Sequence, residues 1–199
     1  MTLALQQRQG RFNGFLSKSI GSKSEPIRRS RPCARSCRVE GRLRELLLSG
    51  RENTDLEFKS SLRWNLEEGR KDREMTDAVV KTIAAFLNTQ GGTLLIGVSD
   101  DRLPIGIEVD QFDDDDKFLL HLYQTAQNAL GAAATALIRT SFADTPAGQV
   151  CIVDCAKSSE PVICNTKKFR DAFFVRTGPG TKNLEGDERA NFVRSHWAG

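Results

Sequence analysis

The sequence lacks several features that would assign it to a class at once. No apolar run approaches the roughly 20 residues of a membrane-spanning helix, which argues against a membrane protein. The five cysteines are an odd number without the regular spacing of a disulfide framework. Reduced thiols in a cytoplasmic protein are the simplest interpretation of this cysteine content.

Two catalytic signatures are also missing. The chain has two histidines, His121 on a helix that core spacing explains and His196 near the chain end. Neither has a partner in the sequence, which argues against ribonuclease chemistry based on histidine. The segment GPGTKN, residues 178–183, lacks the Gly-Lys-Ser/Thr ending of a phosphate-binding loop.

The composition indicates one globular domain with a basic extension. Of the 199 residues, 39% are hydrophobic and 28% are charged, as in an ordinary folded protein. Residues 1–39 hold nine Lys or Arg and one acidic residue, Glu25, yet the whole chain has a formal net charge of +3. The remainder is therefore net negative. A basic arm of this kind predicts contact with a polyanion.

Residues 1–38 are predicted to be this arm and to be disordered. They are rich in Ser, Arg and Gly and have no apolar period. A cytoplasmic location is expected, although an Arg- and Ser-rich segment that is poor in acid also fits an organelle-targeting peptide. The ordered domain is predicted to span residues 39–199.

Apolar periodicity in residues 39–199 predicts alternating helices and hairpins. Helices are expected over 39–49, 75–88, 117–130 and 184–197, and strands over 55–62, 93–99, 105–110, 136–143, 149–156 and 172–178. This order predicts an α+β fold, with a mixed, largely antiparallel sheet and packed helices forming a single lobe. We expect the helices to cover one face of a curved sheet.

Two clusters that resemble metal sites have simpler explanations. The acidic run 113–116 precedes a helix, where negative charge offsets the helix dipole. Cys151 and Cys155 share a face of one strand, but at about 13 Å apart they are too distant for one zinc ion. Both cysteines are therefore expected in the core.

Three segments carry a resemblance to a known family. These are ENTDLEFKSSL, VVKTIAAFLNTQGGTLLIGVSDDRLPIGIE and AFFVRTGPGTKNL, at residues 52–62, 79–108 and 172–184. At these separations the chain resembles the Schlafen-type AlbA_2 domain over residues 45–195. The resemblance implies a nucleic-acid-interacting fold. It also implies a metal-dependent endoribonuclease that cleaves structured RNA such as tRNA, or alternatively a non-catalytic nucleic-acid-binding regulatory domain.

The resemblance also implies an acidic site. Glu52 and Glu57 match its Glu-x-x-x-x-Glu-Phe-Lys pattern, Lys59 is its lysine, and Asp100 follows a Gly-Val pair as the later acid. Asp101 is a second candidate for that last position. The connection WNLEEGRKDRE, residues 64–74, is longer than in the nuclease members, which leaves the local path between strand and helix open.

The chemistry of these residues is consistent with such a site. Three carboxylates brought together repel one another unless a divalent cation neutralises them, and Mg²⁺ or Mn²⁺ prefers oxygen ligands. Lys59 would stabilise charge that develops on a phosphate. Alanine at any of the three acids is then expected to preserve folding. Alternatively, Glu52 caps a turn, Glu57 pairs with Lys59 or a neighbouring strand, and Asp100 belongs to a hairpin.

Basic residues are expected to contact the RNA. Arg63 would supply a cation, and Arg176 and Lys182 flank the turn TGPGT. One lobe offers little concave surface for a folded RNA, so a homodimer with a two-lobed cleft is expected. Its interface would use Phe192, Val193 and Trp197 on the last helix, unless these residues pack on the chain's own sheet.

Overall fold

The main sheet has four strands and both parallel and antiparallel pairs. The computed structural model describes residues 34–49 and 52–197. The strands are β1 (Leu56–Lys59), β4 (Gly92–Ile96), β5 (Ile138–Thr145) and β6 (Gly148–Cys155). Their order is β1-β4-β6-β5, with β1 parallel to β4 and the other neighbours antiparallel. The predicted α+β class with a mixed, largely antiparallel sheet is confirmed.

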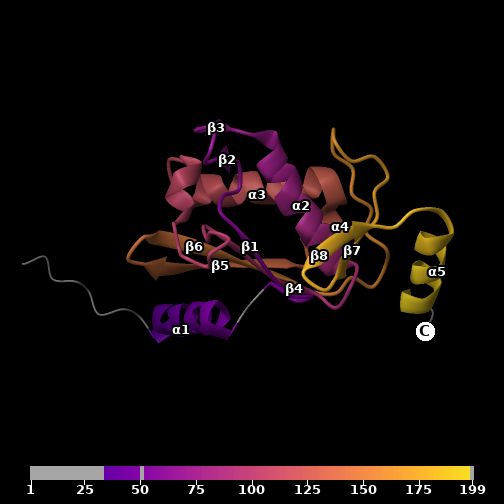
Figure 1. Ribbon diagram of the computed structural model, residues 1–199, viewed down its shortest axis with the longest axis horizontal. Helices are drawn as coiled ribbons and strands as arrows, with labels where there is room; N and C mark the ends of the chain where they lie inside the picture. Colours follow the sequence, from indigo (N-terminus) through magenta and orange to yellow (C-terminus); the bar gives the residue numbers. More distant parts are fainter. Residues whose placement is uncertain (1–33, 50–51, 198–199) are drawn as a thin grey trace, which may run out of the picture. The chain divides into compact units, whose positions relative to one another are not determined.

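Helices pack on both faces of this sheet, which corrects the expectation of one covered face (Figure 1). α2 (Arg73–Leu87), α3 (Asp115–Leu130) and the short α4 (Ala132–Thr135) pack on one face, and α1 (Ala34–Ser49) packs on the other. The reason lies in β4, where Leu94 and Ile96 face α2 and α3 while Leu95 faces α1. A strand that is apolar on both sides must be covered on both. None of the described helices is long and apolar enough to cross a membrane.

α1 is attached to the sheet by its apolar side and by one ion pair. Leu43 is buried against the sheet, and the Arg42 guanidinium donates two hydrogen bonds of 2.7 and 2.6 Å to the Asp154 carboxylate. The helix begins at Ala34, so the predicted boundary between residues 38 and 39 falls inside it. Residues 1–33 of the predicted basic arm lie outside the described residues.

Two segments have structures that differ from the predictions. The polar segment 64–74 contains a hairpin of β2 (Trp64–Asn65) and β3 (Arg70–Lys71), with Gly69 at a positive φ of 62° in its turn. Residues 105–110, predicted as a strand, instead form the 3₁₀ helix η1 (Ile107–Asp110) after a single bridge between Val98 and Pro104. The amides of Ile105 and Gly106 both donate to the Gly97 carbonyl, which turns the chain away from the sheet.

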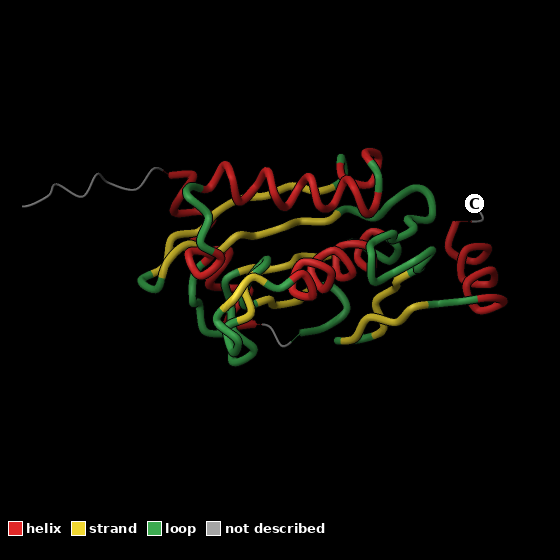
Figure 2. Tube along the Cα trace, turned by 90° about the horizontal axis from the view of Figure 1, so that it is seen from above, coloured by secondary structure: helices red, strands yellow, loops and turns green. Residues whose placement is uncertain are grey.

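The C-terminal part forms a separate hairpin followed by a helix (Figure 2). β7 (Phe174–Thr177) pairs with β8 (Gly180–Asn183), where only a turn was predicted, and α5 (Gly186–Trp197) follows. Asn88, fully buried at the end of α2, ties this part to the body. Its amide donates to the carbonyls of Val162 and Phe174 and accepts from the Val162 amide.

The apolar stripe of α5 packs on its own chain. Phe192, Val193 and Trp197 are half-buried against a cluster made by Phe173, Val175 and Leu184. Intramolecular packing was the alternative to a dimer interface at this stripe, and it is what the structure shows. The homodimer itself stays a prediction.

Candidate functional site

Glu57 is held between two cations. Its carboxylate accepts from Lys59 Nζ at 2.5 Å and from Arg176 Nη1 at 2.7 Å. The Glu57 residue is 8% exposed, and the Arg176 side chain is 1% exposed. Both carboxylate oxygens are therefore engaged inside the protein, and the predicted proximity of Lys59 to Glu57 is observed.

The other two acids occupy different surroundings. Glu52 is half-buried, and its Oε1 accepts a hydrogen bond of 3.1 Å from the Phe58 amide on β1. Asp100 is exposed in the turn that follows Val98. Because β1 and β4 run parallel, Lys59 and the segment leading to Asp100 leave the sheet at the same end, where the amides of residues 97 and 98 donate to the Lys59 carbonyl.

These acids do not form a metal ligand set in this arrangement. Among residues 34–49 and 52–197, no three His, Cys, Asp or Glu side chains gather in a way that could hold a metal ion. A cation at Glu57 would have to displace Lys59 or Arg176. The Mg²⁺ or Mn²⁺ dependence stays a prediction that the local geometry does not favour.

Arg176 does not have the predicted surface position. Besides Glu57, its guanidinium donates to the carbonyls of Asn53 at 2.6 Å and Pro179 at 3.0 Å. A side chain buried in this way cannot reach a phosphate, so direct contact of Arg176 with RNA is corrected to a structural contact. Lys182 is exposed on β8 and forms an ion pair with Glu188.

Arg63 lies on a loop that a buried carboxylate fixes. Asp110 is fully buried and accepts from the amides of Leu62, Arg63 and Trp64 at 2.8, 2.7 and 3.1 Å. The Arg63 guanidinium donates to the carbonyls of Asp110 and Gln111 and lies 3.4 Å from the centre of the Phe112 ring. Arg63 is thus oriented along the edge of a pocket.

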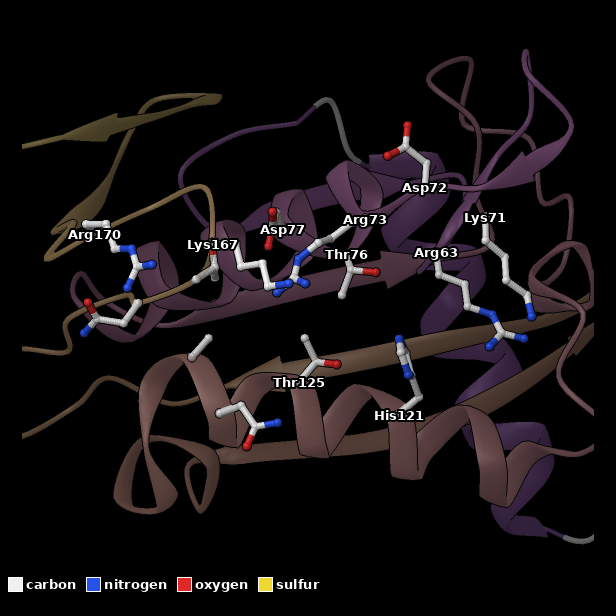
Figure 3. Close-up of a pocket in the computed structure, with 14 residues that line it drawn as sticks. Arg63, Lys71, Asp72, Arg73, Thr76, Asp77, His121, Thr125, Lys167 and Arg170 are labelled. Carbon is white, nitrogen blue, oxygen red and sulfur yellow. The ribbon is translucent and has the colours of Figure 1, made fainter.

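This pocket, which we name the α2–α3 pocket, has a volume of about 620 Å³. Figure 3 shows side chains entering it from both helices and from the loop before β7. Its lining consists of Arg63, Lys71, Asp72, Arg73, Thr76, Asp77, His121, Thr125, Asn128, Ala129, Asn165, Thr166, Lys167 and Arg170. Five Lys or Arg side chains and two carboxylates therefore surround one cavity.

Four of the five cations are free to bind a ligand. Lys71, Arg73, Lys167 and Arg170 are exposed, and within the described chain their side chains have no hydrogen bond or ion pair. Cations held together without partners raise the local concentration of anions. The arrangement is chemically suited to a phosphate-containing ligand.

The interior of the pocket contributes groups of a different kind. Asp77 is 5% exposed, and no hydrogen bond or ion pair engages its carboxylate within the described residues. His121 is half-buried, and its Nε2 atom is buried without a hydrogen-bond partner. Burial, assisted by the charges of Arg63 and Lys71, lowers the pKa of His121 below its ordinary value, which favours the neutral imidazole.

A family model for the Schlafen AlbA_2 domain matches residues 52–185, which is most of the chain. The chain belongs to the Schlafen AlbA_2 family. The segments that suggested this assignment lie in the regions of β1, β4 and the β7–β8 hairpin. The suspected family is confirmed.

Solved structures that are similar to this Schlafen AlbA_2 domain include the following two. The DIP2311 protein from Corynebacterium diphtheriae has 19% identity and a TM-score of 0.54, over 78% of this chain and 32% of its own. The N-terminal domain of a RecG-related protein from Nitrosomonas europaea has 18% identity and a TM-score of 0.47, over 69% and 86%. No curated protein matches. The likeness to DIP2311 supports the fold alone, and the chain spans about a third of that protein.

Most of the α2–α3 pocket was not found from the sequence of this AlbA_2 domain. The sequence assigns only Arg63 among the lining residues to nucleic acid, and it gives His121 no partner and no role. Two short basic stretches, GRKDR at 69–73 and TKKFR at 166–170, carried the available signal. They begin 97 positions apart, and nothing in this spacing indicates that they share one cavity.

Proposed function

We propose that this Schlafen AlbA_2 domain binds RNA through the α2–α3 pocket. The observation that carries the proposal is the set of four unpaired cations, Lys71, Arg73, Lys167 and Arg170, beside the oriented Arg63. Phosphate contacts from Lys and Arg dominate the affinity of proteins for nucleic acids. The family assignment supports the same ligand class.

The cations lie on three segments that the fold holds close together. Lys71 and Arg73 belong to the hairpin and to the start of α2, while Lys167 and Arg170 lie on the loop before β7. Their spread around one cavity suits a folded or single-stranded backbone better than a single point contact. We also propose that the domain forms a homodimer, which would place two such surfaces on one RNA.

Removing three of these cations tests the proposal. Arg73→Ala, Lys167→Ala and Arg170→Ala together should weaken RNA binding at least about tenfold and reduce the slope of log K against log salt by about 2. Fluorescence anisotropy with a labelled tRNA, at several salt concentrations, measures both quantities.

The matched control changes the same charge elsewhere. Arg139, Lys157 and Arg194 are exposed and lie outside the pocket, and their triple alanine variant should keep most of the affinity and slope. Equal losses in both triple variants would mean that overall charge, and not the pocket, determines binding.

RNA cleavage at the end of the sheet that carries Asp100 is a second proposal. The observation that favours it is the parallel pairing of β1 with β4, which brings Lys59 and the turn of Asp100 to one end. Glu52, Glu57, Lys59 and Asp100 remain the proposed catalytic residues, with Mg²⁺ or Mn²⁺ as the proposed cofactor.

Asp100→Asn is the cleanest variant for this second proposal because the side chain is exposed and contributes nothing to the core. If the acid is catalytic, cleavage of tRNA with Mn²⁺ should fall at least about 100-fold, and chelator should abolish it. Asp101→Asn tests the neighbouring candidate, and Glu160→Gln is an exposed control. Cleavage that survives both chelator and Asp100→Asn excludes this site.

A further inference from the structure

We propose that the α2–α3 pocket receives a single nucleotide, with its phosphate at the cations and its nucleoside hydrogen-bonded to Asp77 and His121. The inference rests on the proposed RNA binding and adds what the pocket recognises. The nucleotide is either free or one unit of an RNA chain, and both present the same phosphate and nucleoside.

Asp77 is the group that a simple anion site does not explain. The residue is 5% exposed and lines the cavity, and within the described part of the chain its carboxylate has no hydrogen-bond partner. An ionised carboxylate only accepts hydrogen bonds and repels anions. A site made for phosphate alone would be weakened by it. A ligand that also brings hydrogen-bond donors, such as ribose hydroxyls or base N–H groups, is stabilised by it.

A purely structural role explains the buried Asp77 less well than ligand binding does. The residue lies in the second turn of α2, beyond the first turn where a carboxylate interacts best with the helix dipole. Asp72 already caps that helix by accepting from the Glu74 amide. Lys168 carries charge in the vicinity of Asp77, but its ammonium pairs with Glu74 instead.

His121 provides a second hydrogen-bonding group inside the pocket. Its Nε2 atom is buried and unpartnered, and its ring lies 5.4 Å from the Phe112 ring. A neutral imidazole has one donor and one acceptor nitrogen, so it can pair with an uncharged polar group of a nucleoside. In Figure 3, His121 points from α3 into the space that Thr76 and Arg63 face from the other side.

The pocket is larger than a bare phosphate requires. A volume of about 620 Å³ falls in the range of roughly 300–1,000 Å³ that is typical of small-molecule sites. Arg63 and Lys71 lie toward one end of the view in Figure 3 and Arg170 toward the other, with Asp77 between them. A nucleotide has the required combination of an anionic end and a polar, partly apolar body.

The experiment compares nucleotides with an anion that has no nucleoside. Wild-type protein is titrated with the four ribonucleoside 5′-monophosphates and with inorganic pyrophosphate, by calorimetry. At least one nucleotide should bind about tenfold tighter than pyrophosphate. Asp77→Asn should weaken that nucleotide about tenfold and leave pyrophosphate unchanged or tighter, because a repelling charge is removed. Glu160→Gln is the control and should change neither.

Two outcomes overturn the inference. One is that no nucleotide binds better than pyrophosphate, and the other is that Asp77→Asn weakens both ligands equally. If the Asp77 variant does not fold, backbone NMR of the wild type decides instead. Nucleotide should shift the amide signals of Thr76, Asp77 and His121, and shifts confined to other regions would exclude the pocket.

The same titrations separate this inference from the proposed function. If tRNA binds and loses affinity in the Arg73, Lys167 and Arg170 variant while no nucleotide binds, RNA binding stands and the nucleotide pocket fails. If a nucleotide binds but tRNA does not, the nucleotide pocket stands and the proposed RNA binding fails. Displacement of labelled RNA by the preferred nucleotide shows that the RNA places a nucleotide in the same pocket, whereas a nucleotide that binds without displacing RNA is a free ligand.

Discussion

Replacing Arg176 by methionine should lower the free energy of unfolding by about 3–5 kcal/mol, because the buried Glu57 carboxylate loses the more deeply buried of its two cationic partners. The Arg176 side chain is 1% exposed, and the Glu57 side chain is 11% exposed. The substitution also removes the hydrogen bonds to the carbonyls of Asn53 and Pro179. Lys59 remains beside Glu57 but is more exposed. Urea denaturation followed by circular dichroism measures the change.

Two further variants test whether the loss of stability comes from breaking the ion pair between Arg176 and Glu57. Glu57→Gln combined with Arg176→Met should be less destabilised than the sum of the two single variants, since the two charges are removed together. Lys182→Met removes an exposed ion pair and should cost about 0–1 kcal/mol. If the double variant shows strict additivity, Arg176 and Glu57 are not energetically coupled.

The ion pair between Glu57 and Arg176 changes how variants of the predicted acidic site must be interpreted. The predicted cluster of mutually repelling carboxylates implies that alanine at Glu57 preserves folding. In the structure two cations neutralise this carboxylate, and its removal leaves the buried Arg176 guanidinium without its ion-pair partner. A loss of activity in Glu57→Ala therefore reports on folding as well as on catalysis, which is why Asp100 is the better test.

Asp110→Ala should also destabilise the domain, by about 3 kcal/mol or more. Three backbone amides, of Leu62, Arg63 and Trp64, would lose their shared acceptor inside the protein. Each hydrogen bond to a charged group contributes about 1.5–3 kcal/mol, and unpaired buried amides are costly. Burial raises the pKa of Asp110, and the three amide hydrogen bonds oppose that rise.

Thermal and urea unfolding of Asp110→Ala measure this loss, with two reference variants. Asp110→Asn keeps an acceptor oxygen of similar position and should be less destabilised. Asp113→Ala, on the following exposed turn, removes a surface ion pair with Lys117 and should cost at most about 1 kcal/mol. A loss below about 1 kcal/mol for Asp110→Ala would show that the three amides find other partners.

The sequence predicted the elements whose evidence is local. The apolar period of α2 and α3 was clear, and the Asp114 cap of α3 lies within the expected acidic run. Residues 105–110 were assigned to a strand because their alternation is that of a strand. The side chain of Asp110 instead binds amides 46–48 positions earlier in the chain, and no local pattern reports such a contact.

The candidate sites were likewise predicted where the evidence is local in sequence and missed where the contacts are long-range. The pattern that contains Glu52, Glu57 and Lys59 is contiguous, so it was readable, whereas the ion-pair partner of Glu57 lies 119 positions away. The α2–α3 pocket draws its lining from the regions of residues 63–77, 121–129 and 165–170. Folding brings these three segments together. Which cations find an ion-pair partner and which four stay free depends on the position of all three segments, so the sequence alone does not show it.

The buried amide of Asn88 has a consequence for how this domain can be divided or fused. One side chain joins the end of α2 to residues 162 and 174, more than 70 positions downstream. A fragment that stops before residue 162 would lose these partners and would expose the apolar side chains of α2 that pack on Cys164, Ala172 and Phe174. The main sheet and the C-terminal hairpin therefore form one cooperative unit. A junction to another protein belongs beyond α5, and not in the long loop before β7.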